Sequence, residues 1–361
     1  MYENPRLILD SSNPPEPGQI IWRSPSNLAI VKYWGKHGQQ LPRNPSLSLT
    51  LAASCTDTAI GYAFKETVNN QIDLEFKFHG EENEAFRAKV LAFLESLEPQ
   101  FPFLRQLELS IQTGNSFPHS AGIASSASSM SALALCLCTL EDALFGTLQE
   151  EDAFDVKASY IARLGSGSAC RSIYPYAALW GKTPAVAGSS DEFAVPVEEL
   201  LHPTFKDFHD DILIVSSSEK SVSSRAGHAL MEGNPYADAR YKQAQSRLST
   251  LIEALRTGDL EAFGKIAEDE ALTLHALMMA SNPSYMLLHP NTVALIEKIR
   301  AYRAETKHPV YFSLDAGPNI HLLYPGSIIS DVRGWIEEDL KQHCVDNWYI
   351  QDWVGEGPEE I

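Results

Sequence analysis

A stretch of small residues leading into an apolar segment is the first part of the chain that could bind a ligand. It reads HSAGIASSASSMSALALCL, from His119 to Leu137, and places Ser125 and Ser126 at the expected start of a helix. The first turn of a helix offers free backbone N–H groups and the positive end of the helix dipole, and small side chains let an anion approach them. The stretch is therefore a candidate polyphosphate site. A closely packed core helix with a serine N-cap would have the same composition.

Two further segments place cations beside small or polar residues. In SPSNLAIVKYWGK, residues 24–36, Lys32 and Lys36 follow an apolar run, and both could bind phosphate as point charges. In RLGSGSACRS, residues 163–172, a Gly/Ser loop leads to Arg171, whose planar guanidinium can hold a carboxylate or phosphate through two hydrogen bonds. The alternatives are lysines at a solvated strand end and a flexible turn with an exposed arginine.

The segment SLDAGPNIHLLY, residues 313–324, has a carboxylate at the expected end of a strand. Asp315 precedes Ala-Gly-Pro-Asn, so by composition alone it is a turn former. The functional interpretation is a carboxylate that acts as a base or pairs with a cation. Each segment taken alone leaves both interpretations open.

Taken together and in this order, the segments resemble the diphosphomevalonate decarboxylases, a family within the superfamily of galacto-, homoserine, mevalonate and phosphomevalonate (GHMP) kinases. The matching motifs extend from about residue 24 to residue 325. They are NLAIVKYWGK (27–36), PRNPSLSLTL (42–51), NSFPHSAGIASSA (115–127), RLGSGSACRS (163–172) and DAGPN (315–319).

The resemblance implies an enzyme that uses ATP and Mg²⁺ to convert mevalonate 5-diphosphate to isopentenyl diphosphate. ATP would phosphorylate the tertiary 3-hydroxyl, and phosphate would then leave as carbon dioxide is lost. The implied fold is α+β, a two-domain GHMP-kinase-like fold with a ribosomal protein S5 domain 2-like N-terminal domain and a ferredoxin-like C-terminal domain. We place these domains at residues 1–195 and 196–361, with the phosphate-binding loop in the first and the substrate between them.

The resemblance also assigns roles to single residues. Asp315 is the catalytic carboxylate near the 3-hydroxyl, Lys32 lies beside it, and Arg171 pairs with the substrate carboxylate. The expected substrate-binding residues are Asn27, Tyr33, Lys36, Ser166, Gly167, Ser168 and Arg171. The expected ATP-binding residues are Asn115, Ser120, Gly122, Ala124, Ser125 and Ser126, and Ser126 is also the expected magnesium contact.

Three departures from the family pattern lie near the expected diphosphate end of the site. The loop at residues 37–41, HGQQL, is short, Arg43 replaces a common aliphatic residue, and Pro45 replaces a common serine. They leave the choice between a monophosphate and a diphosphate substrate open. The alternatives are therefore a phosphomevalonate decarboxylase or a mevalonate 3-kinase. A serine hydrolase is disfavoured because GSGSA does not fit the G-x-S-x-G pattern.

Composition narrows the partners and the location. The formal net charge of −19, without a Lys/Arg cluster, disfavours nucleic acids and anionic membranes as partners. The five cysteines form no CxxC pair, which is typical of reduced thiols in the cytosol. The N-terminus lacks a signal-peptide pattern, and no run has the roughly 18 apolar residues of a membrane span. We expect a cytoplasmic protein and, from the resemblance, a homodimer.

The elements that must position these residues alternate irregularly between strands and helices, which favours α+β over a doubly wound sheet. We expect an extended N-terminal arm and short strands, broken by turns, from residue 20 to about 78. The expected helices span 83–97, 125–140, 151–165, 221–232, 236–257, 260–280 and 292–305, with a last helix from about 331. Further strands are expected at 106–114, 211–217, 310–316 and 320–325.

Overall fold

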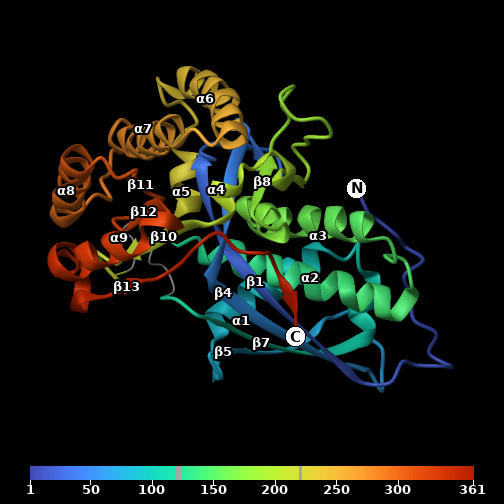
Figure 1. Ribbon diagram of the computed structural model, residues 1–361. Coiled ribbons are helices and arrows are strands. Elements are labelled where there is room, and N and C mark those ends of the chain that lie inside the picture. Colours follow the sequence, from blue (N-terminus) through green and yellow to red (C-terminus); the bar gives the residue numbers. More distant parts are fainter. Residues whose placement is uncertain (119–122, 219–221) are drawn as a thin grey trace.

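The computed structural model covers residues 1–361 and describes all of them except 119–122 and 219–221. Two sheets organise the molecule. The larger sheet has the strand order β14-β1-β4-β7-β5-β6, and the smaller one has the order β11-β12-β10-β13. In Figure 1 the smaller sheet lies at the left with α8 and α9, α6 and α7 lie at the top, and β5, β7 and α1 of the first half lie below.

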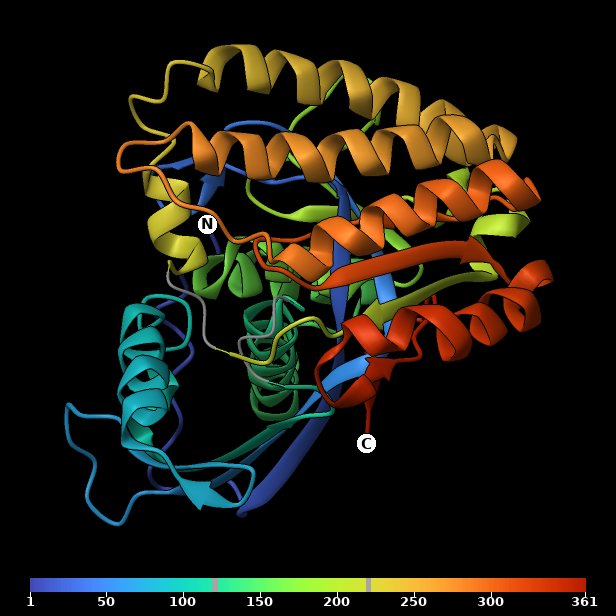
Figure 2. The same ribbon diagram turned by 90° about the vertical axis from the view of Figure 1, so that its left-hand side faces the viewer.

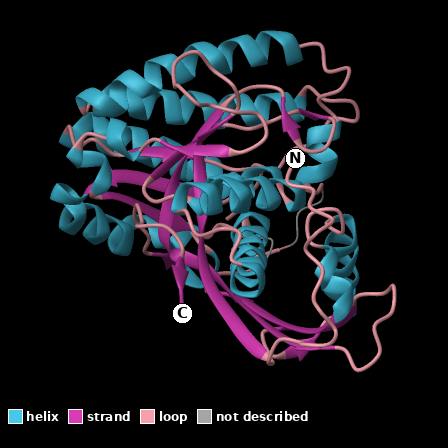
Figure 3. Cartoon of the chain, turned by 90° about the vertical axis from the view of Figure 1, so that its right-hand side faces the viewer, coloured by secondary structure: helices cyan, strands magenta, loops and turns pink. Residues whose placement is uncertain are grey.

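Two long antiparallel strands form the centre of the larger sheet. They are β1 (Gly18–Val31) and β4 (Ser46–Phe64). The prediction of short strands broken by turns was wrong for this region. Pro25 does not end β1, because a register shift between Pro25 and Asn27 places the proline, which has no N–H, at an irregularity in the ladder. The long strands of the larger sheet extend toward the helices of the second half of the molecule (Figure 3).

The neighbours of these strands divide the larger sheet. The second half of β4 pairs with β7, whereas its first four residues pair with β8. The other strands of this sheet are β5 (Asp73–Phe78), β6 (Glu81–Glu82), β7 (Leu107–Asn115), β8 (Ala177–Trp180), β9 (Ala194–Pro196) and β14 (Glu359–Glu360). The small hairpin β2 (Lys36–His37) and β3 (Leu41–Pro42) stands apart from it.

Three helices complete the first half of the molecule. They are α1 (Glu84–Ser96), α2 (Ser125–Phe145) and α3 (Glu151–Gly165), close to their predicted bounds. By length and hydropathy α2 could cross a membrane. Within the described residues it is the one such helix, and 61% of its most apolar window is buried inside the molecule. We therefore interpret it as a core helix.

The second half stacks helices on the smaller sheet. Its strands are β10 (Phe208–Leu213), β11 (Tyr311–Ser313), β12 (Ile320–Pro325) and β13 (Tyr349–Ile350). Its helices are α4 (Pro203–Lys206), α5 (Ser224–Ala229), α6 (Ala237–Thr257), α7 (Leu260–Met279), α8 (Pro290–Thr306) and α9 (Ile329–Trp335). Figure 2 shows α6 and α7 lying side by side. The helix predicted at 221–232 is shorter, and its first residue lies outside the described residues.

The two halves share a hydrophobic core, and the C-terminal tail also joins them. Leu28 and Ile30 of β1 are buried in one cluster with Leu251 of α6 and Phe263 of α7. The C-terminal tail, which we did not predict, returns to the larger sheet, where β14 pairs with β1. On its way the Asp352 carboxylate accepts hydrogen bonds from three successive backbone N–H groups of β4. The boundary at 195/196 stays a prediction, because the last residues pack on the first half.

The expected N-terminal arm is ordered by polar contacts rather than by regular structure. Residues 1–17 form no helix or strand, yet Leu7 and Leu9 are buried. The amide side chain of Gln106 accepts from the backbone N–H of Leu9 at 2.8 Å and donates to its carbonyl at 2.9 Å. Gln106 therefore replaces the strand partner that this segment lacks.

Two helical glycines lead to a prediction about packing. A Cβ at Gly264 in α7 would lie 2.0 Å from the Tyr311 ring, whereas a Cβ at Gly334 in α9 would meet nothing within 4 Å. We expect Gly264→Ala to lower the free energy of unfolding by about 1–3 kcal/mol through overpacking. Gly334→Ala should raise it by up to about 1 kcal/mol, because alanine favours the helix. Urea unfolding of both variants checks this, and shifts of the same sign would contradict it.

Candidate active site

A cavity of about 970 Å³ lies where the two halves meet. Its walls come from the end of β1, the beginning of α2, the turn after α3, α5, and the loop between β11 and β12. Most of the predicted site residues line it. They are Asn27, Lys32, Tyr33, Lys36, Ala124, Ser125, Ser126, Ser166, Gly167, Ser168, Arg171 and Asp315.

Three predicted residues are not placed in this cavity. Asn115 lines a separate, smaller hollow, and its Oδ1 accepts a hydrogen bond from the Thr56 hydroxyl at 2.8 Å. The same Thr56 hydroxyl lies 2.6 Å from Ser128 Oγ, so Asn115 is connected to the first turn of α2 although it lines the other hollow. Ser120 and Gly122 lie outside the described residues.

An ion pair joins the two halves inside the cavity. Lys32 Nζ lies 2.9 Å from Asp315 Oδ1. The lysine side chain is 3% exposed and the aspartate side chain 22% exposed, so the carboxylate remains open to the cavity. Lys32 follows the last residue of β1, and Asp315 begins the turn between β11 and β12. Such a pair can orient a hydroxyl and stabilise charge that develops on it.

Arg171 is buried among neutral partners. The residue is 1% exposed, and its guanidinium donates to the hydroxyls of Ser46 at 2.7 Å and Ser48 at 3.0 Å. It also donates to Asn27 Oδ1 at 3.2 and 3.3 Å. Ser46 and Ser48 are two residues apart on β4 and so share one face of the strand.

This arrangement leaves a positive charge to be balanced. Among the described residues, no carboxylate lies within 4.0 Å of the Arg171 guanidinium. Burial lowers the pKa of Arg171, and neighbouring groups, Cys170 first and then Asp315, act in the opposite direction. A desolvated guanidinium whose partners are neutral is suited to an anionic ligand.

Asn27 connects Arg171 to the Gly/Ser turn. Besides accepting from Arg171, its Nδ2 donates to the Ser172 hydroxyl at 2.7 Å and to the Ser168 carbonyl at 3.2 Å. The turn packs tightly, because a Cβ at Gly167 would lie 2.9 Å from the Tyr33 hydroxyl. Only a glycine permits this approach. Asn27 and Gly167 both line the cavity, and their substrate-binding role stays a prediction.

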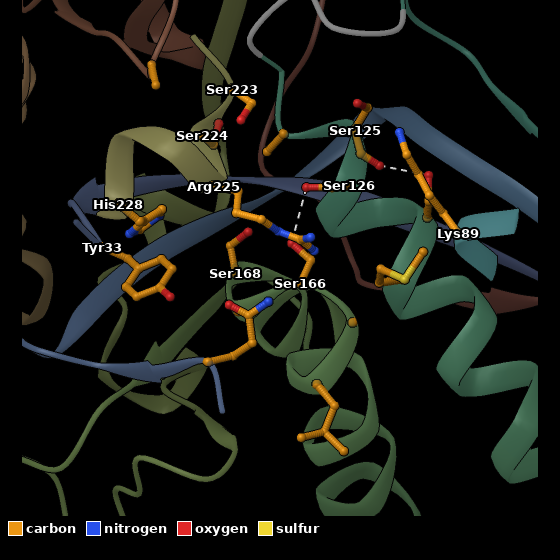
Figure 4. A pocket seen from close by; sticks show the side chains of 18 of the residues that line it. Tyr33, Lys89, Ser125, Ser126, Ser166, Ser168, Ser223, Ser224, Arg225 and His228 are labelled. Atoms are coloured by element: carbon orange, nitrogen blue, oxygen red, sulfur yellow. Dashed lines mark hydrogen bonds between the residues drawn. The ribbon is translucent and has the colours of Figure 1, made fainter. Parts of the chain in front are cut away.

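Serine hydroxyls from α2 and from the turn after α3 meet on the opposite wall. Ser126 Oγ and Ser166 Oγ are 3.1 Å apart (Figure 4). The N-cap of α2 is Ala124, with φ of 47°, and no side chain caps the helix. Outside the residues 119–122 and 219–221 that the structure does not describe, no side chain accepts from the first backbone N–H groups of α2, which are in a position to bind an anion.

Sequence reasoning missed a set of polar residues in the cavity. They are Lys89 of α1 and Ser223, Ser224, Arg225 and His228 at α5. Figure 4 shows Arg225 extending toward Ser126 and Ser166. The only signal was that SSR at 223–225 repeats the serine-then-arginine order of the Gly/Ser motif. For Lys89 there was none, because a lysine on an amphipathic helix is usually a solvated surface residue.

His228 holds the loop that carries Lys36. Its Nδ1 accepts the backbone N–H of Gly35 at 3.0 Å, and its ring packs against Tyr33 and Trp34 with centroids 4.3 and 4.6 Å away. Burial, and secondarily Lys36, lowers the pKa of His228 to about 3. Burial also lowers the pKa of Lys36, with a contribution from Arg225. Lys36 itself donates to Gln40 Oε1 at 2.9 Å.

The neutral histidine predicts a pH dependence of stability. The folded-state pKa of His228 is about 3, below its ordinary value of 6.5, so the unfolded chain binds the proton first as pH falls. Its contribution is complete above pH 6.5 and is lost progressively toward pH 3, by several kcal/mol. His228→Gln retains an acceptor for Gly35 but cannot titrate. Urea unfolding between pH 7 and about 4 should therefore show a shallower loss of stability in the variant than in the parent, and parallel curves would contradict this.

Comparison with known proteins covers both halves of the chain. Residues 24–193 match the family described as diphosphomevalonate decarboxylase-like N-terminal domain. Residues 211–353 match the mevalonate 5-diphosphate decarboxylase C-terminal domain. A diphosphomevalonate decarboxylase from Ganoderma lucidum is 31% identical over 338 residues, which cover 87% of this chain and 80% of the relative.

Solved structures agree in fold. The mevalonate diphosphate decarboxylase from Enterococcus faecalis, in work on mevalonate diphosphate mediated ATP binding, has a TM-score of 0.77 and 27% identity, covering 96% of this chain and 99% of its own. A structure described as MDDEF in complex with MVAPP, AMPPCP and magnesium has a TM-score of 0.79 and 28% identity, with the same coverage. The predicted α+β, GHMP-kinase-like fold is confirmed. With both halves and the whole fold matched, this chain belongs to the diphosphomevalonate decarboxylase family.

Proposed function

We propose that this chain catalyses the ATP- and Mg²⁺-dependent decarboxylation of mevalonate 5-diphosphate to isopentenyl diphosphate, with ADP, phosphate and carbon dioxide as the other products. One observation carries the proposal. The Lys32–Asp315 pair and the buried Arg171 guanidinium with its neutral partners line the same cavity. The reaction needs a group at a tertiary hydroxyl and another at a carboxylate, and these residues supply both.

The first step is phosphorylation of the 3-hydroxyl, which is otherwise a poor leaving group. Asp315 accepts the hydroxyl hydrogen and orients the oxygen toward the phosphorus, and Lys32 keeps the carboxylate in place at 2.9 Å. Phosphoryl transfer depends mainly on positioning and on stabilising charge. Lys32 therefore contributes a fixed positive charge beside the reacting oxygen.

In the second step the C–O bond breaks and phosphate leaves with its electrons. The electron pair of the bond to the carboxyl carbon becomes the alkene bond, and carbon dioxide departs uncharged. Arg171 orients the carboxylate for this alignment. Because Ser46, Ser48 and Asn27 hold the guanidinium without adding charge, the arginine needs little rearrangement when the carboxylate is lost.

The serine-rich wall binds the phosphates. The beginning of α2, with Ala124, Ser125 and Ser126, accommodates the ATP phosphates. The substrate diphosphate contacts Tyr33, Lys36, Ser166, Gly167 and Ser168, and Arg225 adds a cation that the motifs did not identify. Ser120 and Gly122 stay predicted ATP contacts. Asn115 lines the separate hollow, and its ATP contact also stays a prediction.

The residues present fit magnesium held mainly by phosphate oxygens. The described residues contain no group of three or more acidic, histidine or cysteine side chains that could hold a metal. Mg²⁺ is usually bound through few protein ligands together with substrate phosphates. Ser126 Oγ is the protein ligand that we propose. When bound, the ion would neutralise phosphate charge, and Ser126 would position it.

The aromatic end of the cavity accommodates the adenine base. Phe76, Phe78, Phe86 and Phe93 line the cavity on the side of α1 and β5. Flat apolar rings suit a purine, and Lys89 Nζ lies 5.4 Å from the Phe86 ring centroid. A nucleotide would then extend from these rings to the beginning of α2.

The cations that line the cavity favour a diphosphate substrate, whereas the departures in and beside the short loop do not decide between a monophosphate and a diphosphate. Gln40 lines the cavity, but Arg43 and Pro45 do not. Lys36 and Arg225 both line it, which gives two cations for the phosphate end. We therefore retain the diphosphate, with the monophosphate decarboxylase and the 3-kinase as alternative outcomes of the test.

We also propose a cytoplasmic homodimer. The location is supported by the five cysteines, all of which are buried and free. The oligomeric state is supported by the family resemblance alone.

A product assay tests the function. Purified protein is incubated with ATP, Mg²⁺ and mevalonate 5-diphosphate labelled at the carboxyl carbon, and released carbon dioxide and ADP are quantified. We expect one carbon dioxide per ADP. In Asp315→Ala both should fall by several orders of magnitude, roughly 10³-fold or more, with little change in substrate binding. ADP without carbon dioxide would indicate a 3-kinase, and activity only on the monophosphate would indicate the other sibling.

Arg171 gives a second prediction. Arg171→Ala should weaken substrate binding and lower turnover. Arg171→Lys should recover little, because lysine keeps the charge but lacks the planar fork that contacts Ser46, Ser48 and Asn27 at once. Steady-state kinetics of the two variants checks this. A lysine variant with near-parental kcat/KM would show that charge alone is sufficient.

A further inference from the structure

The backbone of Lys32 takes two of its three hydrogen-bond partners from the second half of the molecule. β1 ends at Val31, which still pairs with Leu47 of β4 just after a register shift in the ladder. The backbone N–H of Lys32 donates to Glu270 Oε2 at 2.8 Å, and its carbonyl accepts from Arg240 Nη2 at 3.2 Å. The Asn44 side chain donates to the same carbonyl at 3.1 Å. Side chains therefore replace the strand ladder at the residue that carries the reactive lysine.

Glu270 is the centre of this contact. It lies on α7, is 0% exposed, and receives both Nη atoms of Arg240, at 2.7 and 2.5 Å. Arg247 donates to its Oε1 at 2.8 Å. These donors lower the pKa of Glu270, although its burial acts in the opposite direction. The carboxylate is ionised and fully hydrogen-bonded, so it is held in a fixed position for the Lys32 N–H.

The same helix also contacts the other member of the ion pair. His275, five residues after Glu270, is 2% exposed, and its Nε2 lies 3.1 Å from the Asp315 carbonyl oxygen. A carbonyl can only accept, so Nε2 is the donor. One rigid helix therefore holds the backbone of Lys32 at one position and that of Asp315 at another.

We propose that α7 positions the reactive pair, with Glu270 and His275 as positioning residues that set the separation of Lys32 from Asp315. Neither residue lines the cavity, so both act through the backbones they hold. The proposal rests on the proposed function, because it assigns a catalytic consequence to the Lys32–Asp315 geometry. Misplacement of reacting groups by about 1 Å can lower turnover roughly 10²-fold.

Glu268 offers a matched control on the same helix. It is 6% exposed, and it forms an ion pair with Arg303 at 2.5 Å, as Glu270 does with Arg240. None of its contacts reaches Lys32 or Asp315. Glu268→Gln and Glu270→Gln therefore both weaken a buried ion pair, but only the second alters the contact with Lys32.

The experiment compares these two variants with the parent protein. For Glu270→Gln we expect kcat to fall roughly 10²-fold with KM changed less than about threefold, and for Glu268→Gln we expect kcat near that of the parent. Equal kcat values in the two variants would overturn the proposal. In the background of Asp315→Asn, Glu270→Gln should lower the residual kcat little further, and full additivity would also overturn it.

Amide hydrogen exchange gives a readout that needs no activity. Exchange at the Lys32 amide should be faster in Glu270→Gln than in Glu268→Gln, and equal protection would contradict the proposal. A parent protein without decarboxylase activity would overturn the proposed function but leave this test intact.

If Glu270→Gln does not fold, two substitutions of His275 test the proposal instead. His275→Gln can still donate to the Asp315 carbonyl and should retain more kcat than His275→Leu, whereas equal losses would overturn the proposal.

Discussion

The ion pair between Lys32 and Asp315 is the contact on which the site depends. Its members are 283 positions apart in the sequence and come from the two halves of the fold. Placing a lysine at 3% exposure removes most of its hydration, which is costly unless a partner is held in the right position. Two features hold the halves together. They are the hydrophobic core shared by β1, α6 and α7, and the C-terminal tail, which pairs with β1.

Two buried arginines show how the fold separates structural from ligand-binding charge. Arg163 and Arg171 are both 1% exposed. Arg163 pairs with Glu192 at 2.7 Å and also donates to the carbonyl of that residue, so its charge is balanced within the protein. Among the described residues, the hydrogen-bond acceptors of Arg171 are all neutral oxygens. In a chain of net charge −19, this cation and the lysines at the cavity make a locally positive site for an anionic ligand.

Several local features were readable before the structure. The helices α3 and α6 begin and end within one residue of their predicted bounds, because their apolar spacing and the glycines at or beyond their ends are local signals. Most of the site residues that the motifs predicted also line the cavity. The strand predictions were poorer, because β1 and β4 pass through proline and polar positions that normally mark turns, and long-range pairing overrides those signals.

What the sequence by itself determined is the set of reactive side chains and the short segments that carry them. Local sequence features include the small residues in the motif before α2, the glycine at 167 and the turn residues after Asp315. Each depends on only a few adjacent residues. Only the tertiary structure decided how the segments meet. Glu270 contacts Lys32 across 238 positions, and Asn115 lines a different hollow from the residues at the beginning of α2. Such contacts leave no periodic pattern, because they depend on packing between distant segments rather than on local conformational preference.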